Sequence, residues 1–484
     1  MKRIKNNQIS RKFTNLSNNS KKIKKNGAFF IINGETQNGN LYIQDAIKNG
    51  ATNLISENKE DFKKIDKKIN TYLVSDTRKA FANSCTKYFL NPSDKLDVCC
   101  ITGTNGKTSV SFLLKKIWRK ESPGLIGTIE TSYSKTKSLS SLTTPDTYEL
   151  NETMSKMVKK NIKNVFLEVS SHSLAMSRIE CININSAIFT NMSRDHLDFH
   201  KNFNEYFNCK SKLFMNHLRF SKSKNKIAVI NMDDKYGLKL LKLISKDIKV
   251  ITYSLRNKNA DFYLKNNYKL NSKFLLEIEN KRKTYFIKTS LFGEYNFQNI
   301  LAAFSYSLTK GLNVEKIIKG IEAFRGAPGR LEKIKNNNLN IFIDYAHTPD
   351  ALKKSLISLK ENFNNKKLFV VFGCGGNRDK GKRKTMGAIA EEFADKVILT
   401  SDNPRFEDPL KIIEDILGGF KKKGEKAIII NRREAIRSSI KNLNYNCVLL
   451  IAGKGHENYQ EIDGKRKTFS DLEEAKEALK EYAS

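Results

Sequence analysis

The sequence lacks several features, and each absence excludes a class of protein. No run of about 18 apolar residues occurs, so no membrane-spanning helix is expected. The 7 cysteines are scattered without a Cys-x-x-Cys pair, which argues against a disulfide framework or a cysteine-ligated zinc site. Residues 1–7 are basic but lack the apolar segment of a secretory signal. We therefore expect a cytoplasmic protein with reduced thiols.

Acidic residues are also scarce relative to basic ones. The chain has 51 Asp and Glu against 87 Lys and Arg, which gives a net charge of +36. Such an excess raises the possibility of a nucleic-acid-binding ATPase. The basic residues are spread over the whole chain, without a basic helix carrying interleaved aromatics and without a zinc-finger or RNP pattern. We interpret the charge as a solvated cationic surface that attracts polyanionic small molecules, and we expect no nucleic-acid partner.

A chain of 484 residues is too long for a single hydrophobic core, and its length predicts three domains of about 150 residues each. The alternation of expected strands and helices predicts that all three are α/β domains. We place them at residues 1–92, 93–328 and 329–484. The first is a small α/β domain, the second a mostly parallel P-loop ATPase-like sheet, and the third a Rossmann-like doubly wound sheet. A small antiparallel insert is expected from 261 to 287, where apolar residues alternate. The other expected strands are 27–32, 53–56, 72–75, 96–101, 165–169, 186–190, 226–231, 340–344, 368–372, 397–400, 427–430 and 448–452; a helix is expected at 42–50.

The most informative stretch is a glycine-rich turn at residues 101–109. An apolar run precedes it, and a helical apolar pattern follows at Val110, Leu113, Leu114 and Ile117. Strand, turn and helix start together hold phosphate through free backbone N–H groups and a positive helix end. Lys107 adds a cation for the transferred phosphate, and Thr108 adds a hydroxyl that can ligate magnesium. Ile101 stands where the general P-loop pattern has a glycine, and the preceding glycine is Gly103, so the turn departs from that pattern.

Polar residues follow two of the central strands, and they include scarce histidines. Residues 168–172 (Glu-Val-Ser-Ser-His) follow one strand, and residues 191–198, which contain His196, follow another. Parallel strands would bring both segments to the sheet edge beside the phosphate turn. A carboxylate and an imidazole there could hold a second magnesium ion, whereas the alternative interpretation is helix capping by Ser and Asp.

Six segments give the chain a resemblance to the Mur ligase family, within the superfamily that includes folylpolyglutamate synthetase. Residues 344–351 and 375–383 narrow it to the type that adds the third amino acid of the peptidoglycan stem peptide. The other four segments are 103–109, 168–172, 193–198 and 293–299. The resemblance covers the whole chain and implies the same three-domain division. It further implies a ligase that phosphorylates the terminal carboxylate of UDP-MurNAc-L-Ala-D-Glu with ATP and joins an amine to the acyl phosphate.

The resemblance also implies roles for residues of the central site. Lys107, Glu168, His196 and Lys210 match catalytic positions, with Thr108 on the first magnesium ion and Glu168 and His196 on the second. Lys210 matches a lysine that takes up CO₂ as a carbamate and then serves as an anionic metal ligand; the residue pattern alone indicates a surface lysine. The matching ATP contacts are Gly103, Thr104, Asn105, Gly106, Lys107, Thr108, Ser109, Asn299, Arg330, Asp344 and His347.

The substrate positions of the family are partly altered. The contacts to UDP-MurNAc-dipeptide match Ser20, Thr143, Thr144, Ser170, Met176 and Arg178. This chain has Asn19-Ser20-Lys21 where the family usually has Asp-Ser-Arg near uridine, and Asn38 replaces an acidic turn residue. Met176 replaces a polar contact. The N-terminal uridine site is therefore where the chain departs most from the family pattern.

The amino-acid pocket implied by the resemblance selects meso-diaminopimelate. Residues 402–405 read Asp-Asn-Pro-Arg, which in this family marks the diaminopimelate-adding enzymes. Arg405 can bind the additional carboxylate in a bidentate fork, which L-lysine cannot offer. The matching contacts are Arg378, Asp402, Asn403, Pro404, Arg405, Gly453 and Glu457. Taken alone, the tetrapeptide would be a turn motif.

Several alternatives remain open at this point. The same reaction could use L-lysine or another diamino acid such as lanthionine. Folylpolyglutamate synthesis would not need residues 402–405, and a catalytically inactive scaffold would not need Lys107, Glu168, His196 and Lys210. Our prediction is a monomer that takes three small-molecule substrates, ATP, UDP-MurNAc-L-Ala-D-Glu and meso-diaminopimelate, with Mg²⁺ and a CO₂-derived carbamate.

Overall fold

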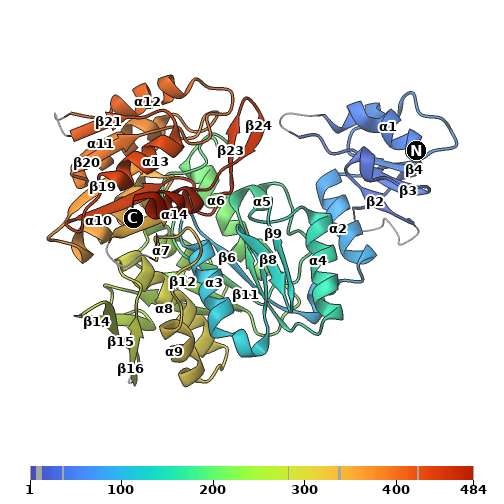
Figure 1. Cartoon of the computed structure of the whole chain (residues 1–484). Coiled ribbons are helices and arrows are strands. Elements are labelled where there is room, and N and C mark those ends of the chain that lie inside the picture. The colour runs from blue at the N-terminus through green and yellow to red at the C-terminus, as the bar shows by residue number, and fades with distance from the viewer. Residues whose placement is uncertain are drawn as a thin grey trace.

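The structure is a computed structural model that describes residues 2–6, 13–34, 38–281, 283–335, 339–421 and 425–482. Residues 1 and 7 of the predicted basic start lie outside the described residues. The chain folds into three α/β domains, as predicted, and each is built on its own sheet. In Figure 1 the N-terminal domain (blue) and the C-terminal domain (orange to red) lie on opposite sides of the central one.

The N-terminal sheet has the strand order β1-β5-β4-β3-β2, and all of its pairings are parallel. The strands predicted at 27–32, 53–56 and 72–75 correspond to β3, β4 and β5, and the predicted helix 42–50 contains α1. The elements are β1 (Lys2–Arg3), β2 (Leu16–Ser17), β3 (Gly27–Phe30), α1 (Ile43–Lys48), β4 (Ala51–Ser56), β5 (Asn70–Leu73) and α2 (Thr77–Tyr88).

The central sheet has the order β16-β15-β14-β13-β12-β11-β6-β10-β7-β8-β9 and is parallel from β14 to β7. The predicted antiparallel insert is confirmed as β14–β16. The elements are β6 (Asp97–Thr102), α3 (Lys107–Ile117), β7 (Gly124–Ile126), β8 (Glu130–Tyr133), β9 (Thr136–Leu139), α4 (Thr147–Lys159), β10 (Asn164–Glu168), α5 (Ser171–Ala175), β11 (Ser186–Phe189), α6 (Phe203–Lys212), β12 (Ile227–Asn231), α7 (Lys235–Leu241), β13 (Lys249–Ser254), β14 (Phe262–Leu270), β15 (Lys273–Asn280), β16 (Lys283–Thr289), α8 (Glu294–Thr309) and α9 (Val314–Glu322).

Strand β6 shows why the central sheet is covered on both faces. Its side chains alternate, so that Cys99 and Ile101 pack with α3 and α8 while Val98 and Cys100 pack with α4 and α6. All four apolar positions predicted for the helix after the turn are buried within α3. A strand buried on both faces reads as a continuous apolar run, which is the signal that the sequence offered.

The C-terminal sheet has the order β17-β18-β22-β19-β20-β21 and is parallel except for β17. On β22, Val448 and Leu450 pack with α10–α12, whereas Leu449 and Ile451 pack with α13 and α14, so the predicted doubly wound fold is confirmed. The elements are β17 (Glu332–Lys333), β18 (Asn340–Asp344), α10 (Pro349–Asn362), β19 (Lys367–Phe372), α11 (Gly381–Phe393), β20 (Lys396–Leu399), α12 (Pro409–Leu417), β21 (Glu425–Ile428), α13 (Arg432–Lys441), β22 (Cys447–Ala452), β23 (Tyr459–Ile462), β24 (Lys465–Thr468) and α14 (Asp471–Tyr482).

Some elements differ from the prediction. Strand β21 ends at Ile428 instead of 430, because the chain turns before Asn431 caps α13. The hairpin β23–β24 was not predicted, although its turn carries the Asp-Gly signal: Asp463 and Gly464 both have positive φ, at 49° and 72°. The short strands β7–β9 were also missed.

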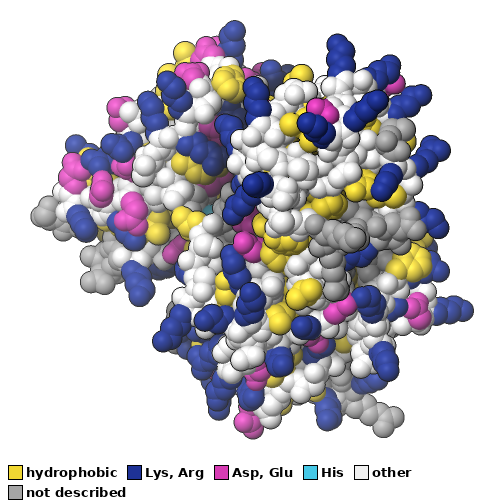
Figure 2. Space-filling model, turned by 90° about the vertical axis from the view of Figure 1, so that its right-hand side faces the viewer, with side chains coloured by type: hydrophobic (Ala, Val, Ile, Leu, Met, Phe, Trp, Pro, Cys, Tyr) yellow, Lys and Arg dark blue, Asp and Glu magenta, His cyan; other side chains and the backbone are white. Residues whose placement is uncertain are grey.

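The surface charge is dispersed. Figure 2 shows Lys and Arg side chains over the whole face in view, with acidic and apolar side chains between them. Among the described residues, no helix combines the length and the apolar character that crossing a membrane requires.

Candidate active site

Three adjacent parallel strands place the candidate catalytic segments at one sheet edge. Strands β11, β6 and β10 are neighbours, so the residues after their carboxyl ends meet there. The glycine-rich turn follows β6, Glu168 ends β10, and the segment from Asn191 to Asp198 follows β11. The structure thus brings together the three segments that the sequence placed beside a phosphate.

The turn between β6 and α3 requires its two glycines. Gly103 and Gly106 have φ of +152° and +87°. A Cβ added to Gly103 would lie 1.9 Å from Oγ1 of Thr190, and one added to Gly106 would lie 2.5 Å from Oδ1 of Asn299. Glycine therefore allows the backbone to pass close to both side chains and present the N-terminus of α3 to an anion.

Two lysine side chains converge on this turn. Nζ of Lys107 donates to the carbonyl oxygens of Gly103 and Thr104 at 2.8 and 2.9 Å, and Nζ of Lys210, on α6, donates to the same Gly103 oxygen at 2.9 Å. Burial lowers the pKa of Lys107, and burial together with the nearby Lys107 charge lowers the pKa of Lys210 well below its ordinary value. Lys210 is buried, contrary to the surface position that its pattern alone indicated.

Glu168 is a fully buried carboxylate held by hydroxyl groups. It accepts hydrogen bonds from Thr108, Ser111 and Thr128 at 2.9, 3.0 and 2.7 Å. Nη2 of Arg330, from the C-terminal domain, lies 3.3 Å from Oγ1 of Thr108. The helix after the turn, through Thr108 and Ser111, and the loop residue Thr128 therefore fix the position of this carboxylate.

Two histidines of the predicted segments, His172 and His196, form a second group. The rings of His172 and His196 lie 4.7 Å apart, and Nε2 of His196 is 3.3 Å from Asp195. Burial lowers the pKa of His172 to about 4 and of His196 to about 3, so both are neutral near pH 7. Among the described residues, no group of three or more His, Cys, Asp or Glu side chains is arranged to hold a metal ion. A metal site here would need hydroxyl, carbamate or phosphate oxygens as well.

A pocket of about 60 Å³ lies over the phosphate turn and collects most of the predicted ATP contacts. Arg330 stacks its guanidinium 4.5 Å from the centroid of the Tyr345 ring, and Asp344 accepts a hydrogen bond from Ser355. The predicted contacts that line this pocket are Asn105, Gly106, Ser109, Asn299, Arg330 and Asp344.

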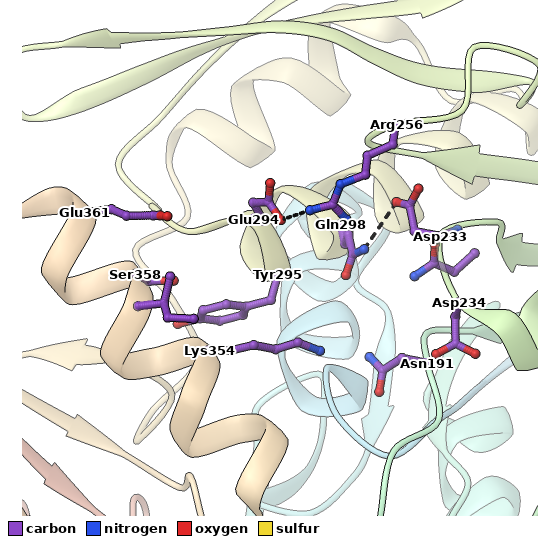
Figure 3. Close-up of a pocket in the computed structure, with 12 residues that line it drawn as sticks. Asn191, Asp233, Asp234, Arg256, Glu294, Tyr295, Gln298, Lys354, Ser358 and Glu361 are labelled. Carbon is purple, nitrogen blue, oxygen red and sulfur yellow. Dashed lines mark hydrogen bonds and ion pairs between the residues drawn. The ribbon is translucent and has the colours of Figure 1, made fainter. Parts of the chain in front are cut away.

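A second pocket of about 300 Å³ adjoins the first and shares Asn191, Tyr295 and Lys354 with it. Figure 3 shows Gln298 and Asp233 of the central domain hydrogen-bonded to each other, and Lys354, from α10 of the C-terminal domain, extending toward Asn191. Next to the phosphate turn, Nδ2 of Asn105 donates to Asp350 of the same helix at 2.8 Å. The two domains therefore enclose these pockets together.

A cleft of about 480 Å³ runs from Asp195 and His196 to the C-terminal domain. It is lined by residues that were predicted to contact the UDP-MurNAc-dipeptide and by residues that were predicted to contact the amino acid. These are Thr143, Ser170 and Arg178 for the dipeptide and Arg378, Asp402, Asn403, Arg405, Gly453 and Glu457 for the amino acid.

Arg405 is fixed at the far end of the cleft by two backbone contacts and one carboxylate. Its Nη1 donates to the carbonyl of Gly376 at 2.8 Å, its Nε lies 3.7 Å from Glu461, and its backbone bridges to Ile462 of β23. Asn403 donates to Oε2 of Glu457 at 3.0 Å. Arg378 reaches back to Asp198 of the central domain, with 3.6 Å between Nη1 and Oδ2.

Some predicted residues do not line these pockets. Thr144 is fully buried and donates to the backbone oxygen of Glu168 at 2.9 Å. Met176 accepts a hydrogen bond on its sulfur from Arg178, and Pro404 does not line the cleft. His347 lines the larger cleft in place of the nucleotide pocket. Ser20 is buried in the N-terminal domain, where its backbone oxygen accepts from Asn49.

The cleft also contains residues that the sequence reasoning missed. Tyr345, Lys382, Tyr459 and Arg466 line it, and the first two lie inside segments already singled out by resemblance. The hairpin β23–β24 supplies the last two, and the Asp-Gly turn at its tip was the signal that could have found it.

Two protein-family descriptions match most of the chain. "Mur ligase middle domain" matches residues 101–306, and "Mur ligase, glutamate ligase domain" matches residues 329–455. Together they include the phosphate turn, Glu168, Lys210 and Arg405. The chain belongs to the Mur ligase family.

Similar proteins extend over almost the whole chain. Two relatives named "UDP-N-acetylmuramoyl-L-alanyl-D-glutamate--2,6-diaminopimelate ligase" are each 38% identical: that of Aquifex aeolicus with 97% of this chain and 94% of its own covered, and that of Clostridium tetani with 99% and 97%. A solved structure of the same name matches with a TM-score of 0.68 and 32% identity over 98% and 96% of the two chains. The MurF ligase from Thermotoga maritima in complex with ADP shares the fold, with a TM-score of 0.64 at 19% identity over 97% of each chain.

Proposed function

We propose that this protein is an ATP-dependent ligase that adds meso-diaminopimelate to UDP-MurNAc-L-Ala-D-Glu in peptidoglycan precursor synthesis. The observation that carries the proposal is one continuous cleft, with Asp195 and His196 beside the phosphate turn at one end and Arg405 and Glu457 at the other. A ligase needs a phosphoryl donor, an acceptor carboxylate and an amine within reach of one another.

The reaction forms and breaks bonds in two steps. The terminal carboxylate of UDP-MurNAc-L-Ala-D-Glu attacks the γ-phosphorus of ATP, which yields an acyl phosphate and ADP. The free amine of meso-diaminopimelate then attacks the acyl carbon, loses a proton, and the tetrahedral intermediate collapses to an amide and inorganic phosphate. Both steps develop negative charge on oxygen, so positioned cations and N–H donors lower the barrier.

The phosphate turn supplies those donors. Lys107 binds only backbone carbonyls among the hydrogen bonds found for it, so its ammonium can turn to a γ-phosphate without breaking an ion pair. The amides at the start of α3 bind the phosphates, and Arg330 approaches from the C-terminal domain. The nucleotide then extends from the small pocket into the adjoining hollow of Figure 3, since about 60 Å³ is too small for a whole nucleotide.

Magnesium fits the oxygen donors of this site. Thr108 would hold a first magnesium ion together with ATP phosphates, and Glu168 and His196 would be ligands of a second. The hydroxyl of Thr108 and the carboxylate of Glu168 are 2.9 Å apart. When bound, magnesium neutralises phosphate charge and polarises the phosphoryl group. Lys210, as a carbamate formed with CO₂, would add an anionic oxygen ligand; its support is its burial beside the phosphate turn.

The two remaining substrates divide the cleft between them. Thr143, Ser170 and Arg178 hold the dipeptide end of the UDP-sugar, and the N-terminal domain with Ser20 holds the nucleotide end. Arg405 and Arg378 bind the distal carboxylate of meso-diaminopimelate, while Glu457 and Asp402 bind an ammonium. We assign the domains to residues 1–92, 93–328 and 329–484, and we expect a cytoplasmic monomer.

The test is the dependence of phosphate release on all three substrates. We expect release from ATP only when UDP-MurNAc-L-Ala-D-Glu and meso-diaminopimelate are both present, together with a product whose mass shows the new amide. ATP hydrolysis that DNA or RNA stimulates, without any effect of the UDP-dipeptide, would overturn the proposal.

A further inference from the structure

Lys454 is a buried cation at the amino-acid end of the cleft. It follows β22, and its side chain has no exposed surface. Its Nζ donates to Oδ1 of Asn403 at 3.0 Å and to Oε2 of Glu457 at 2.9 Å, and it lies 5.4 Å from the centroid of the Tyr459 ring. These contacts fix the ammonium group directly behind residues that line the cleft.

The carboxylate of Glu457 is therefore already balanced before a ligand arrives. Its Oε2 accepts from Lys454 and from Asn403, and its Oε1 accepts from Tyr345 at 3.4 Å. The side chain of Glu457 is 15% exposed, on the cleft side. Burial raises the pKa of the neighbouring Asp402, but the charges of Lys454 and Arg432 outweigh burial and leave that pKa below its ordinary value.

The two candidate amino acids differ in the charge of their distal end. L-Lysine brings a lone ammonium, whereas meso-diaminopimelate brings an ammonium and a carboxylate on one carbon. A lone ammonium near Glu457 also meets the positive charge of Lys454, which is fixed and buried and so poorly screened. The distal end of meso-diaminopimelate is zwitterionic, so its carboxylate is attracted by Lys454 as well as by Arg405.

From this charge arrangement we infer that Lys454 is a specificity-determining residue. Its buried ammonium neutralises Glu457 and thereby rejects diamino acids whose distal end is a lone cation, in favour of those with a distal carboxylate. Lys454 acts by positioning Asn403 and Glu457 and by its charge, without touching the reacting atoms. The inference rests on the proposed function and deepens it, because it names a second selector beside Arg405.

The experiment measures kcat/KM for meso-diaminopimelate and for L-lysine with ATP and UDP-MurNAc-L-Ala-D-Glu. The variants are Lys454→Gln and Lys454→Met, which remove the charge, and Lys454→Arg, which keeps it. Lys476→Gln is the matched control, because Lys476 also pairs with a glutamate three residues away, Glu473 at 2.8 Å, but its side chain is 47% exposed on helix α14. Thermal unfolding and the ATP KM report whether each variant is folded.

We divide the kcat/KM for meso-diaminopimelate by that for L-lysine, and we expect this ratio to fall at least tenfold in both neutral variants. The change should lie in the KM for the amino acids, with little change in the KM for ATP. Lys454→Arg should keep the ratio within threefold of the wild type, and so should Lys476→Gln. A merely structural role predicts that Arg, Gln and Met lower both activities alike.

An unchanged ratio in either folded neutral variant overturns the inference, and a ratio that falls equally in Lys454→Arg does so too. The wild-type protein separates this result from a failure of the proposed function. If the wild type prefers meso-diaminopimelate and the neutral variants do as well, only the role of Lys454 fails. If the wild type uses neither amino acid, both proposals fail.

Discussion

The two ends of the active-site cleft handle charge in different ways. At the phosphate end, Lys107 binds only the backbone carbonyls of Gly103 and Thr104 among the hydrogen bonds found for it, so its charge has no acidic partner there. At the amino-acid end, Arg405 already binds Gly376 and approaches Glu461, and Lys454 already binds Glu457. We therefore propose that the phosphate end neutralises a polyanion, whereas the amino-acid end is already balanced and distinguishes ligands by where their charges lie.

This difference predicts unequal consequences of mutation. Removing a cation from the phosphate end weakens the transition state of every turnover, whatever the amino acid. Removing one from the amino-acid end alters which ligand is preferred and leaves phosphate chemistry in place. The following variants test that contrast, from the largest expected effect to the smallest.

Lys107→Met should abolish ligation, because it removes the cation nearest the transferred phosphate. We expect kcat to fall by about 10³-fold or more, as for other residues that stabilise phosphoryl transfer. Phosphate release at saturating substrates measures the effect, and native mass or calorimetry tests that the UDP-dipeptide still binds. Retention of a tenth of the activity would show that the phosphate end does not depend on this charge.

Lys210→Ala should lower kcat by roughly 10²-fold, because an anionic ligand beside the phosphate turn is lost. In the wild type, removal of dissolved CO₂ should lower activity and added bicarbonate should restore it, whereas the variant should respond to neither. Lys212→Ala on the same helix, α6, is the matched control, since its side chain is exposed. Intact-mass measurement of active enzyme without a carbamate would contradict this role.

Arg405→Ala should lower kcat/KM for meso-diaminopimelate by roughly 10- to 100-fold, the size expected for one charge-assisted contact to a carboxylate. The KM for ATP should stay within twofold. Steady-state kinetics with each substrate varied in turn distinguishes the two effects. A variant with the wild-type diaminopimelate KM would show that this arginine does not read the distal carboxylate.

Asp350→Ala should have the smallest effect, because it removes a contact between domains without touching the substrates. Asp350 accepts a hydrogen bond from Asn105 of the phosphate turn, and Lys354 also pairs with it. We expect ATP KM to rise about two- to fivefold, as for a hydrogen bond that contributes about 0.5–1 kcal/mol. Lys360→Ala on α10 serves as the control. An unchanged ATP KM would mean that this contact does not help to form the nucleotide site.

The sequence predicted the phosphate end better than the amino-acid end, and the reason is physical. The phosphate turn is local: an apolar strand, two glycines and an amphipathic helix lie within residues 97–117, and parallel strands carry Glu168 and His196 to the same edge. The geometry around Arg405 depends on contacts far along the chain, with Gly376 and the hairpin β23–β24. The apolar pattern near Arg405 therefore does not predict those contacts.

The sequence pattern also did not predict which side chains are buried at several positions. Lys210 and Lys454 are charged residues that local pattern places on a surface, yet both are buried against polar partners from distant segments. Thr144 and Ser20 were predicted as substrate contacts, but both are buried in the protein. For them, direct contact with the UDP-sugar stays a prediction.

Competition between amino acids tests the central claim most directly. The protein is given ATP, UDP-MurNAc-L-Ala-D-Glu and equal concentrations of meso-diaminopimelate and L-lysine, and the two products are separated by mass. Our account predicts that the diaminopimelate product exceeds the lysine product by at least a hundredfold. Equal amounts of the two, or an excess of the lysine product, would contradict it.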